Sequence, residues 1–142
     1  MLRLSAFLPY RLSVAANAVS QRIALAYRAR FGLRIPEWRV IAVVAERGEA
    51  TQAELAAATA MDRMGISRAV AGLMARGLLV RRPAPADRRT HALALTAEGE
   101  ALYREIAPAA LALEAGLLAS FSEAERAQLM DLLARLEACA RS

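Results

Sequence analysis

Seven arginines and only two acids lie between Met61 and Thr96, and this pattern suits the binding of a polyanion. A guanidinium stays charged and donates hydrogen bonds in a planar fork that matches phosphate oxygens. The other twelve basic and twelve acidic residues of the chain cancel, so this segment holds the whole net charge of +5. Positive charge gathered in one place points to a partner such as nucleic acid.

The first part of this segment predicts a helix over residues 62 to 76, because apolar residues recur there at the spacing of one helical face. Small and basic side chains occupy the opposite face, which would let the helix approach the major groove of DNA closely. An ordinary surface helix could carry the same arginines, so this helix alone does not decide the function. The candidate contacts on the outer face are Arg63, Met64, Ser67 and Arg68.

The second part predicts a β-hairpin, because the strand-like runs "LLVRR" and "HALAL" flank the turn "PAPADRRT". In the turn, Asp87 stands two residues before Arg89, a spacing at which a carboxylate can hold a guanidinium in one rotamer. His91, Leu93 and Leu95 share one strand face and are expected to point inward. A solvated turn is the alternative, but a candidate DNA-contacting helix followed at once by a basic hairpin favours a winged helix-turn-helix.

Helical patterns precede this unit. Apolar spacings of three and four over residues 5 to 31 predict one long helix, ended by Gly32. A second helix is expected from Pro36 to Gly48. Next, "TQAELAAA" opens with a capping box and predicts a short helix.

Two more helices are expected after the hairpin. Thr96 begins a long one, in which Pro108 is a candidate bend, and Ser122 with Glu125 forms a capping box for the last. The expected fold is therefore mainly α with a small β-hairpin wing.

Several classes of protein are disfavoured. A single histidine and a single cysteine, Cys139, leave no metal-ligand set and no intrachain disulfide. Neither a nucleophile motif nor a phosphate-binding glycine loop is found, so we expect no enzyme and no cofactor. The longest apolar stretch is interrupted by Glu114, and Pro9 and Arg11 break the apolar N-terminal run. We therefore expect a cytoplasmic protein without a membrane partner.

The stretch "MDRMGISRAVAGLMARGLLVRRPAPADRRTHALALTAEG" closely resembles the core of the MarR family of transcriptional regulators. That family has an Asp-x-Arg wing, a strand ending in Leu-Thr and a helix entered through glycine. "PEWRVIAVVAERGEATQAELAAA" and "FSEAERAQLMDLLARLEA" extend the likeness over nearly the whole chain. The residues that carry the central motif are Asp87, Arg88, Arg89, Leu95, Thr96 and Gly99.

The resemblance implies a homodimer on a pseudo-palindromic operator in double-stranded DNA. It implies one domain over residues 1 to 142, with dimerisation helices at 5 to 31 and 100 to 142 and a winged helix-turn-helix lobe at 36 to 96. Members are usually repressors that a small, often aromatic, ligand releases. By the same resemblance, Arg89 enters the minor groove with Asp87 holding it, and Arg63, Ser67 and Arg68 match the major-groove face. Arg81 and Arg88 are implied as phosphate contacts or supports of the wing.

Three points stay open at the level of sequence. Gly65 and Ala84 depart from the family pattern, each at a position that is more often polar or acidic. Tyr27, Phe31 and Trp38 are candidates for an effector pocket, although aromatic residues at helical spacing are more often core. A basic helical module that binds RNA or an acidic protein is the alternative function.

Overall fold

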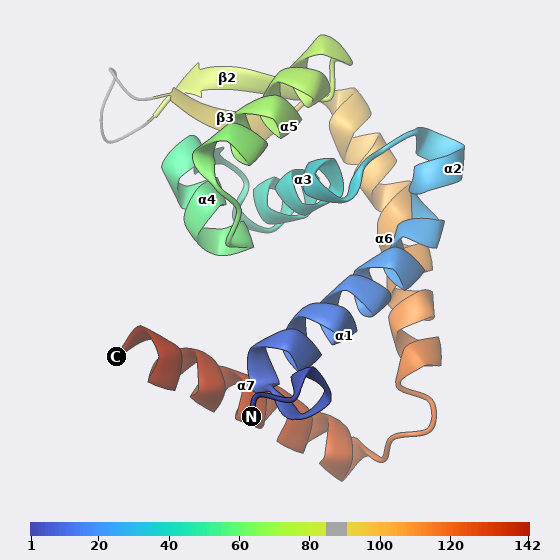
Figure 1. Ribbon diagram of the computed structural model, residues 1–142. Coiled ribbons are helices and arrows are strands. Elements are labelled where there is room, and N and C mark those ends of the chain that lie inside the picture. The colour runs from blue at the N-terminus through green and yellow to red at the C-terminus, as the bar shows by residue number, and fades with distance from the viewer. Residues whose placement is uncertain (85–90) are drawn as a thin grey trace.

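The computed structural model describes residues 1–84 and 91–142. A compact lobe holds the sheet, and a helical arm extends away from it (Figure 1). The helices are α1 (Leu8–Ile23), α2 (Arg28–Phe31), α3 (Ile35–Arg47), α4 (Gln52–Thr59), α5 (Arg63–Ala75), α6 (Ala97–Leu117) and α7 (Glu123–Arg141). The strands are β1 (Ala50–Thr51), β2 (Leu79–Pro83) and β3 (His91–Leu95).

The prediction of one helix over residues 5 to 31 is wrong. A short 3₁₀ turn precedes α1, and a second one at Ala24–Ala26 separates α1 from α2. The break turns Ala24 and Tyr27 into the core, where 2% and 1% of their surfaces stay exposed. No glycine or proline marks this break, so the apolar spacing continues across it unchanged. Gly32 does end the segment, at a φ of +65° that a side chain would disfavour.

Local signals set the helix boundaries of the lobe. Pro36 lies in the first turn of α3, and the Thr51 hydroxyl accepts a hydrogen bond of 3.1 Å from the amide of Glu54 at the start of α4. The Asp62 carboxylate accepts one of 2.7 Å from the amide of Gly65, which caps α5. The predicted capping box at Ser122 is also present, at the start of α7.

The sheet is antiparallel with the strand order β1-β3-β2. The sequence predicted the hairpin but not β1, which is only two residues long and pairs with the far side of β3. As the central strand, β3 is buried from Ala92 to Leu95, and Leu93 and Leu95 point inward as predicted. His91 was expected to point inward and is exposed instead, because it pairs with Pro83 at the outer end of the hairpin.

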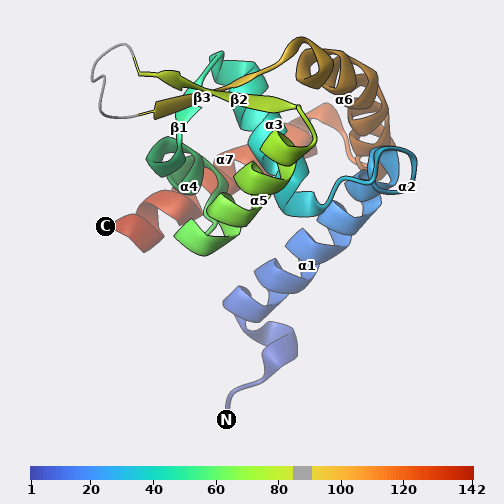
Figure 2. The same ribbon diagram turned by 90° about the horizontal axis from the view of Figure 1, so that it is seen from above.

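The core lies between α3, α5, the sheet and the N-terminal part of α6. Ile41, Val44, Ile66, Leu73 and Leu93 are at most 1% exposed. By contrast, neither α1 nor α7 contains a buried residue. Figures 1 and 2 show that the N-terminal end of α1 projects away from the lobe, and that α7 turns back from the far end of α6. No helix in the described ranges is both long and apolar enough to cross a membrane.

Candidate nucleic-acid interface

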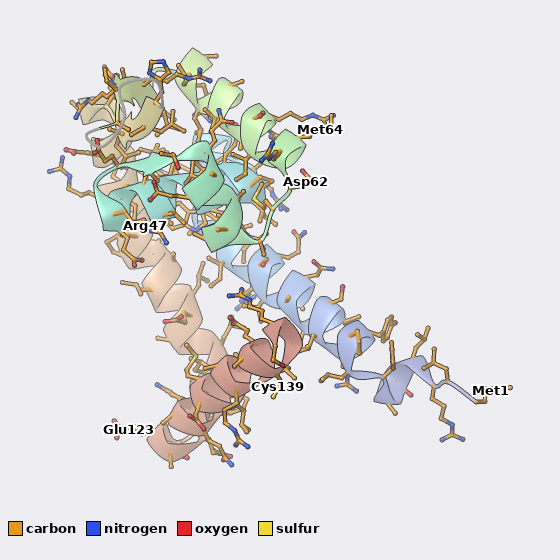
Figure 3. The ribbon with its side chains drawn as sticks, turned by 90° about the vertical axis from the view of Figure 1, so that its left-hand side faces the viewer. Met1, Arg47, Asp62, Met64, Glu123 and Cys139 are labelled. Atoms are coloured by element: carbon orange, nitrogen blue, oxygen red, sulfur yellow. The ribbon has the colours of Figure 1, made fainter. Side chains whose placement is uncertain are left out.

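Helix α5 has one buried and one exposed face, as its sequence predicts. Ile66, Val70 and Leu73 are at most 1% exposed and hold the helix against α3 and the sheet. The outer face begins at the N-cap Asp62, and Figure 3 shows Asp62 and Met64 at this outer end of the lobe. Short or flexible side chains on that face leave the backbone accessible to a groove. The exposed candidates are Arg63, Met64, Ser67 and Arg68.

The described part of the hairpin adds further basic side chains beside α5. Arg81 and Arg82 are exposed on β2, opposite Leu93 and Ala92 of β3. The candidates Asp87, Arg88 and Arg89 lie in the turn between the two strands, outside the described residues. The roles assigned to those three side chains therefore stay predictions.

The sequence reading missed Gln52 in the first turn of α4. The Ser67 hydroxyl of α5 donates a hydrogen bond of 3.4 Å to the side-chain oxygen of Gln52. These residues border a cavity of about 260 Å³, which is also lined by Arg63 and Ala53. Since the amide oxygen accepts from Ser67, the amide NH₂ of Gln52 is left to donate to a ligand. The capping box only indicates where α4 begins, so it gave no sign that Gln52 meets α5.

Arg76, one of the seven clustered arginines, has a structural partner. Its guanidinium donates hydrogen bonds to the carbonyl oxygens of Phe31 at 2.6 Å and Gly32 at 3.4 Å. These bonds join the C-terminal end of α5 to the corner between α2 and α3. The dense arginine pattern therefore combines outward-facing residues with one that holds the lobe together.

The aromatic candidates occupy different places. Tyr27 stacks on Trp38 at 5.4 Å between ring centroids, and Trp38 stacks on Tyr103 at 5.9 Å. Burial raises the pKa of the Tyr27 phenol, against a lowering by the charges of Arg28 and Arg39. Tyr27 is thus a core residue, and it does not line a described cavity.

Trp38 lines one of the described cavities, whereas Phe31 lines none of them. Phe31 is half-buried, with the guanidinium of Arg30 at 4.9 Å from the centre of its ring. The cavity beside Trp38 measures about 220 Å³ and lies between the end of α1, α3 and α6. Tyr103, on α6, was not singled out from the sequence. The residues that line this cavity are Ile23, Trp38, Ala42, Tyr103, Ala107, Ala110, Leu111 and Glu114.

The order of the elements, the α4–α5 pair and the adjoining hairpin define a winged helix-turn-helix protein. The family model described as MarR family matches residues 31–90. Among solved structures, a MarR/EmrR family transcriptional regulator from Acinetobacter sp. ADP1 superposes with a TM-score of 0.90 at 27% identity, over 99% of each chain.

Two curated relatives are transcriptional regulators as well. A putative regulatory protein for the hcr operon of Thauera aromatica is 35% identical over 97 residues, which are 68% of this chain. The repressor NicR of Pseudomonas putida is 35% identical over 91 residues, or 64% of this chain. Each match spans 58% of the relative's own length. The chain belongs to the MarR family of transcriptional regulators.

Proposed function

We propose that this regulator binds a pseudo-palindromic operator as a homodimer, represses transcription there, and is released by a small aromatic ligand. The observation that carries the proposal is that α5 is buried on one face and exposed on the other. Its inner face is fixed by Ile66, Val70 and Leu73, while Arg63, Ser67 and Arg68 face outward from a rigid lobe. A helix held in this way can present its side chains to base edges without losing its own orientation.

The homodimer is supported by apolar side chains outside the lobe. Helices α1 and α7 have no buried residues and carry large apolar side chains that are exposed. Such side chains need a partner surface that covers them. A second copy of the chain supplies a matching surface through a twofold axis, which would also place two lobes on a palindromic site. The exposed apolar residues of α1 and α7 are Leu8, Leu12, Val14, Val19, Leu129, Met130, Leu132 and Leu133.

The small ligand is supported by the cavity beside Trp38. At about 220 Å³ it can hold a single aromatic ring with small substituents. The aromatic rings of Trp38 and Tyr103 both border the cavity and can contact such a ligand, and the cavity lies between the helical arm and α3 of the lobe. Because Glu114 is the one charged residue among the lining side chains, we expect a neutral or phenolic ring rather than a carboxylate.

Repression is supported by the family and by the relative NicR, which is a repressor. The test uses fluorescence anisotropy to compare the affinity of the purified protein for DNA that flanks its own gene with its affinity for an unrelated duplex. We expect selective binding that weakens steeply with salt, because phosphate contacts release counterions. Equal affinity for the flanking DNA, a random duplex and single-stranded RNA would refute sequence-specific regulation and favour a general nucleic-acid module.

Arg63→Ala supplies the matched variant, with Arg28→Ala as its control. Arg63 lies on the outer face of α5, whereas Arg28 is exposed on α2 and bonds to Gln21. We expect Arg63→Ala to lose selectivity for the operator and Arg28→Ala to keep it. Equal loss in both variants would mean that general positive charge, rather than α5, binds the DNA.

A further inference from the structure

The predicted DNA surface continues past α5 into a second cavity. The cavity between α4 and α5 and a neighbouring one of about 280 Å³ share Gln52 and Ala53 in their linings. The second cavity lies between the first turn of α4 and the sheet. Its lining residues are Thr51, Gln52, Ala53, Arg81, His91 and Leu93. A duplex seated on Arg63 and Ser67 would therefore pass over Gln52 and reach this second cavity.

The strand register places the side chains of Arg81 and His91 at this cavity. Pro83 pairs with His91, and Arg81 pairs with Leu93. Because directly paired residues of an antiparallel ladder share a face and side chains alternate along each strand, all four lie on one face. Leu93 is 1% exposed and forms the floor, while Arg81 and His91 are exposed at the rim.

We propose that this second cavity receives a phosphate of the DNA strand that borders the major groove, and that protonated His91 and Arg81 bind it together. The proposal rests on the DNA-binding function argued above and extends it. It assigns a role to His91, which shares the face of Leu93 as its parity predicts but is exposed. It also makes operator binding depend on pH.

The charged groups around the cavity support an anion. Arg81 is the one permanently charged side chain in its lining, and Arg82 stands beside it on β2. Glu54 of α4 is not among the lining residues. Its carboxylate accepts a hydrogen bond of 3.0 Å from the Thr51 hydroxyl and pairs with Arg47 at 3.7 Å. No carboxylate in the described lining therefore competes with an incoming phosphate.

Proton linkage follows from the chemistry of imidazole. A neutral imidazole has one donor, whereas the protonated ring donates from both nitrogens and carries a charge that a phosphate favours. Formation of the complex then takes up a proton, so affinity rises as the pH falls. His91 is the single histidine of the chain, and the α-amino group of Met1 lies at the far end of α1, away from the lobe (Figure 3).

The experiment measures the dissociation constant for the operator at about pH 6 and about pH 8, at fixed ionic strength, for the full chain and two variants. We expect the unaltered protein to bind roughly threefold to tenfold more tightly at the lower pH, as two partly exposed charge contacts, one in each lobe of the dimer, would give. His91→Gln should bind with the weaker affinity at both values. His91→Arg should bind with the tighter affinity at both, because its charge is permanent.

Arg104→Gln is the control, since Arg104 lies on α6 outside this surface and should keep the full pH response. A pH response that survives in His91→Gln, or an affinity of His91→Arg that stays at the weaker level, would overturn the proposal while operator binding itself stands. Failure of the unaltered protein to select the operator would instead refute the proposed function and this extension with it.

Discussion

Arg76, at the C-terminal end of helix α5, donates a hydrogen bond of 2.6 Å to the carbonyl oxygen of Phe31, 45 residues earlier in the chain. The acceptor belongs to the corner between α2 and α3, next to the helix that carries Trp38. The orientation of α5 is thus tied to the base of the helical arm by one side chain. An arginine can do this because its fork reaches two carbonyl groups at once.

Arg76→Ala should lower the free energy of unfolding by about 1 kcal/mol, because two solvent-accessible hydrogen bonds are lost and water replaces them in part. Chemical denaturation measures this change, and Arg28→Ala serves as the control. Operator affinity should fall much less than in Arg63→Ala. If stability stayed unchanged while operator binding was lost, Arg76 would be a DNA contact and not a structural tie.

Gly99→Ala adds only one methyl group but should strongly destabilise the fold, because a Cβ at Gly99 would collide with the carbonyl oxygen of Leu78. That carbonyl also accepts a hydrogen bond of 3.1 Å from the amide of Thr96, so it cannot move away freely. We expect a loss of more than about 3 kcal/mol of unfolding free energy. Thermal and chemical denaturation would show it.

Gly116→Ala on the same helix is the matched control. A Cβ there meets nothing within 4 Å, so the change should be neutral or stabilising by less than about 1 kcal/mol. Similar losses in the two variants would mean that helix propensity, rather than the contact with Leu78, decides the effect.

Arg89→Ala should weaken selective operator binding by roughly tenfold or more without unfolding the protein, as expected for a wing arginine that enters the minor groove. Arg89 lies outside the described residues, so this prediction rests on the Asp-x-Arg motif alone. Anisotropy on operator and random duplex separates selectivity from general charge. An unchanged dissociation constant would remove the wing from the mechanism.

Signals that act over a few residues could be predicted from the sequence, and those that depend on distant partners could not. The capping box at Thr51 and the stop at Gly32 are local, and both are present. His91 lies on the strand face that its parity predicts, the face of Leu93, but it is exposed because it pairs with Pro83 at the outer end of the hairpin, a position that the strand pattern alone does not reveal. In the same way, the role of Arg76 exists only once α5 packs beside the α2–α3 corner.

Trp38 makes the proposed effector cavity directly observable, because it is the single tryptophan of the chain and lines the cavity. A small neutral or phenolic aromatic ligand should quench its fluorescence. At a hundredfold excess over Kd the same ligand should raise the free energy of unfolding by about 2.7 kcal/mol. Ala110→Leu should abolish both effects by filling the cavity, whereas Ala29→Leu, exposed on α2, should keep them. A ligand that still binds the Ala110→Leu variant occupies another site.

The homodimer can be tested on α7, where Leu129 and Leu133 are 42% and 37% exposed and lie one helical turn apart. Replacing both with glutamate would place two charges in the predicted subunit interface, where they cannot be solvated. We expect light scattering after gel filtration to show twice the chain mass of 15.3 kDa for the unaltered protein and a single chain for the variant.

Met64→Glu is the control for this substitution, because Met64 is 66% exposed but lies on the outer face of α5. It should remain dimeric and lose only affinity for DNA. The monomeric α7 variant should also bind the operator weakly, because two lobes on one palindrome gain from a high effective concentration that a single lobe lacks. An unaltered protein that runs as a single chain at micromolar concentration would contradict the dimer, and the exposed apolar residues of α1 and α7 would then need a different partner.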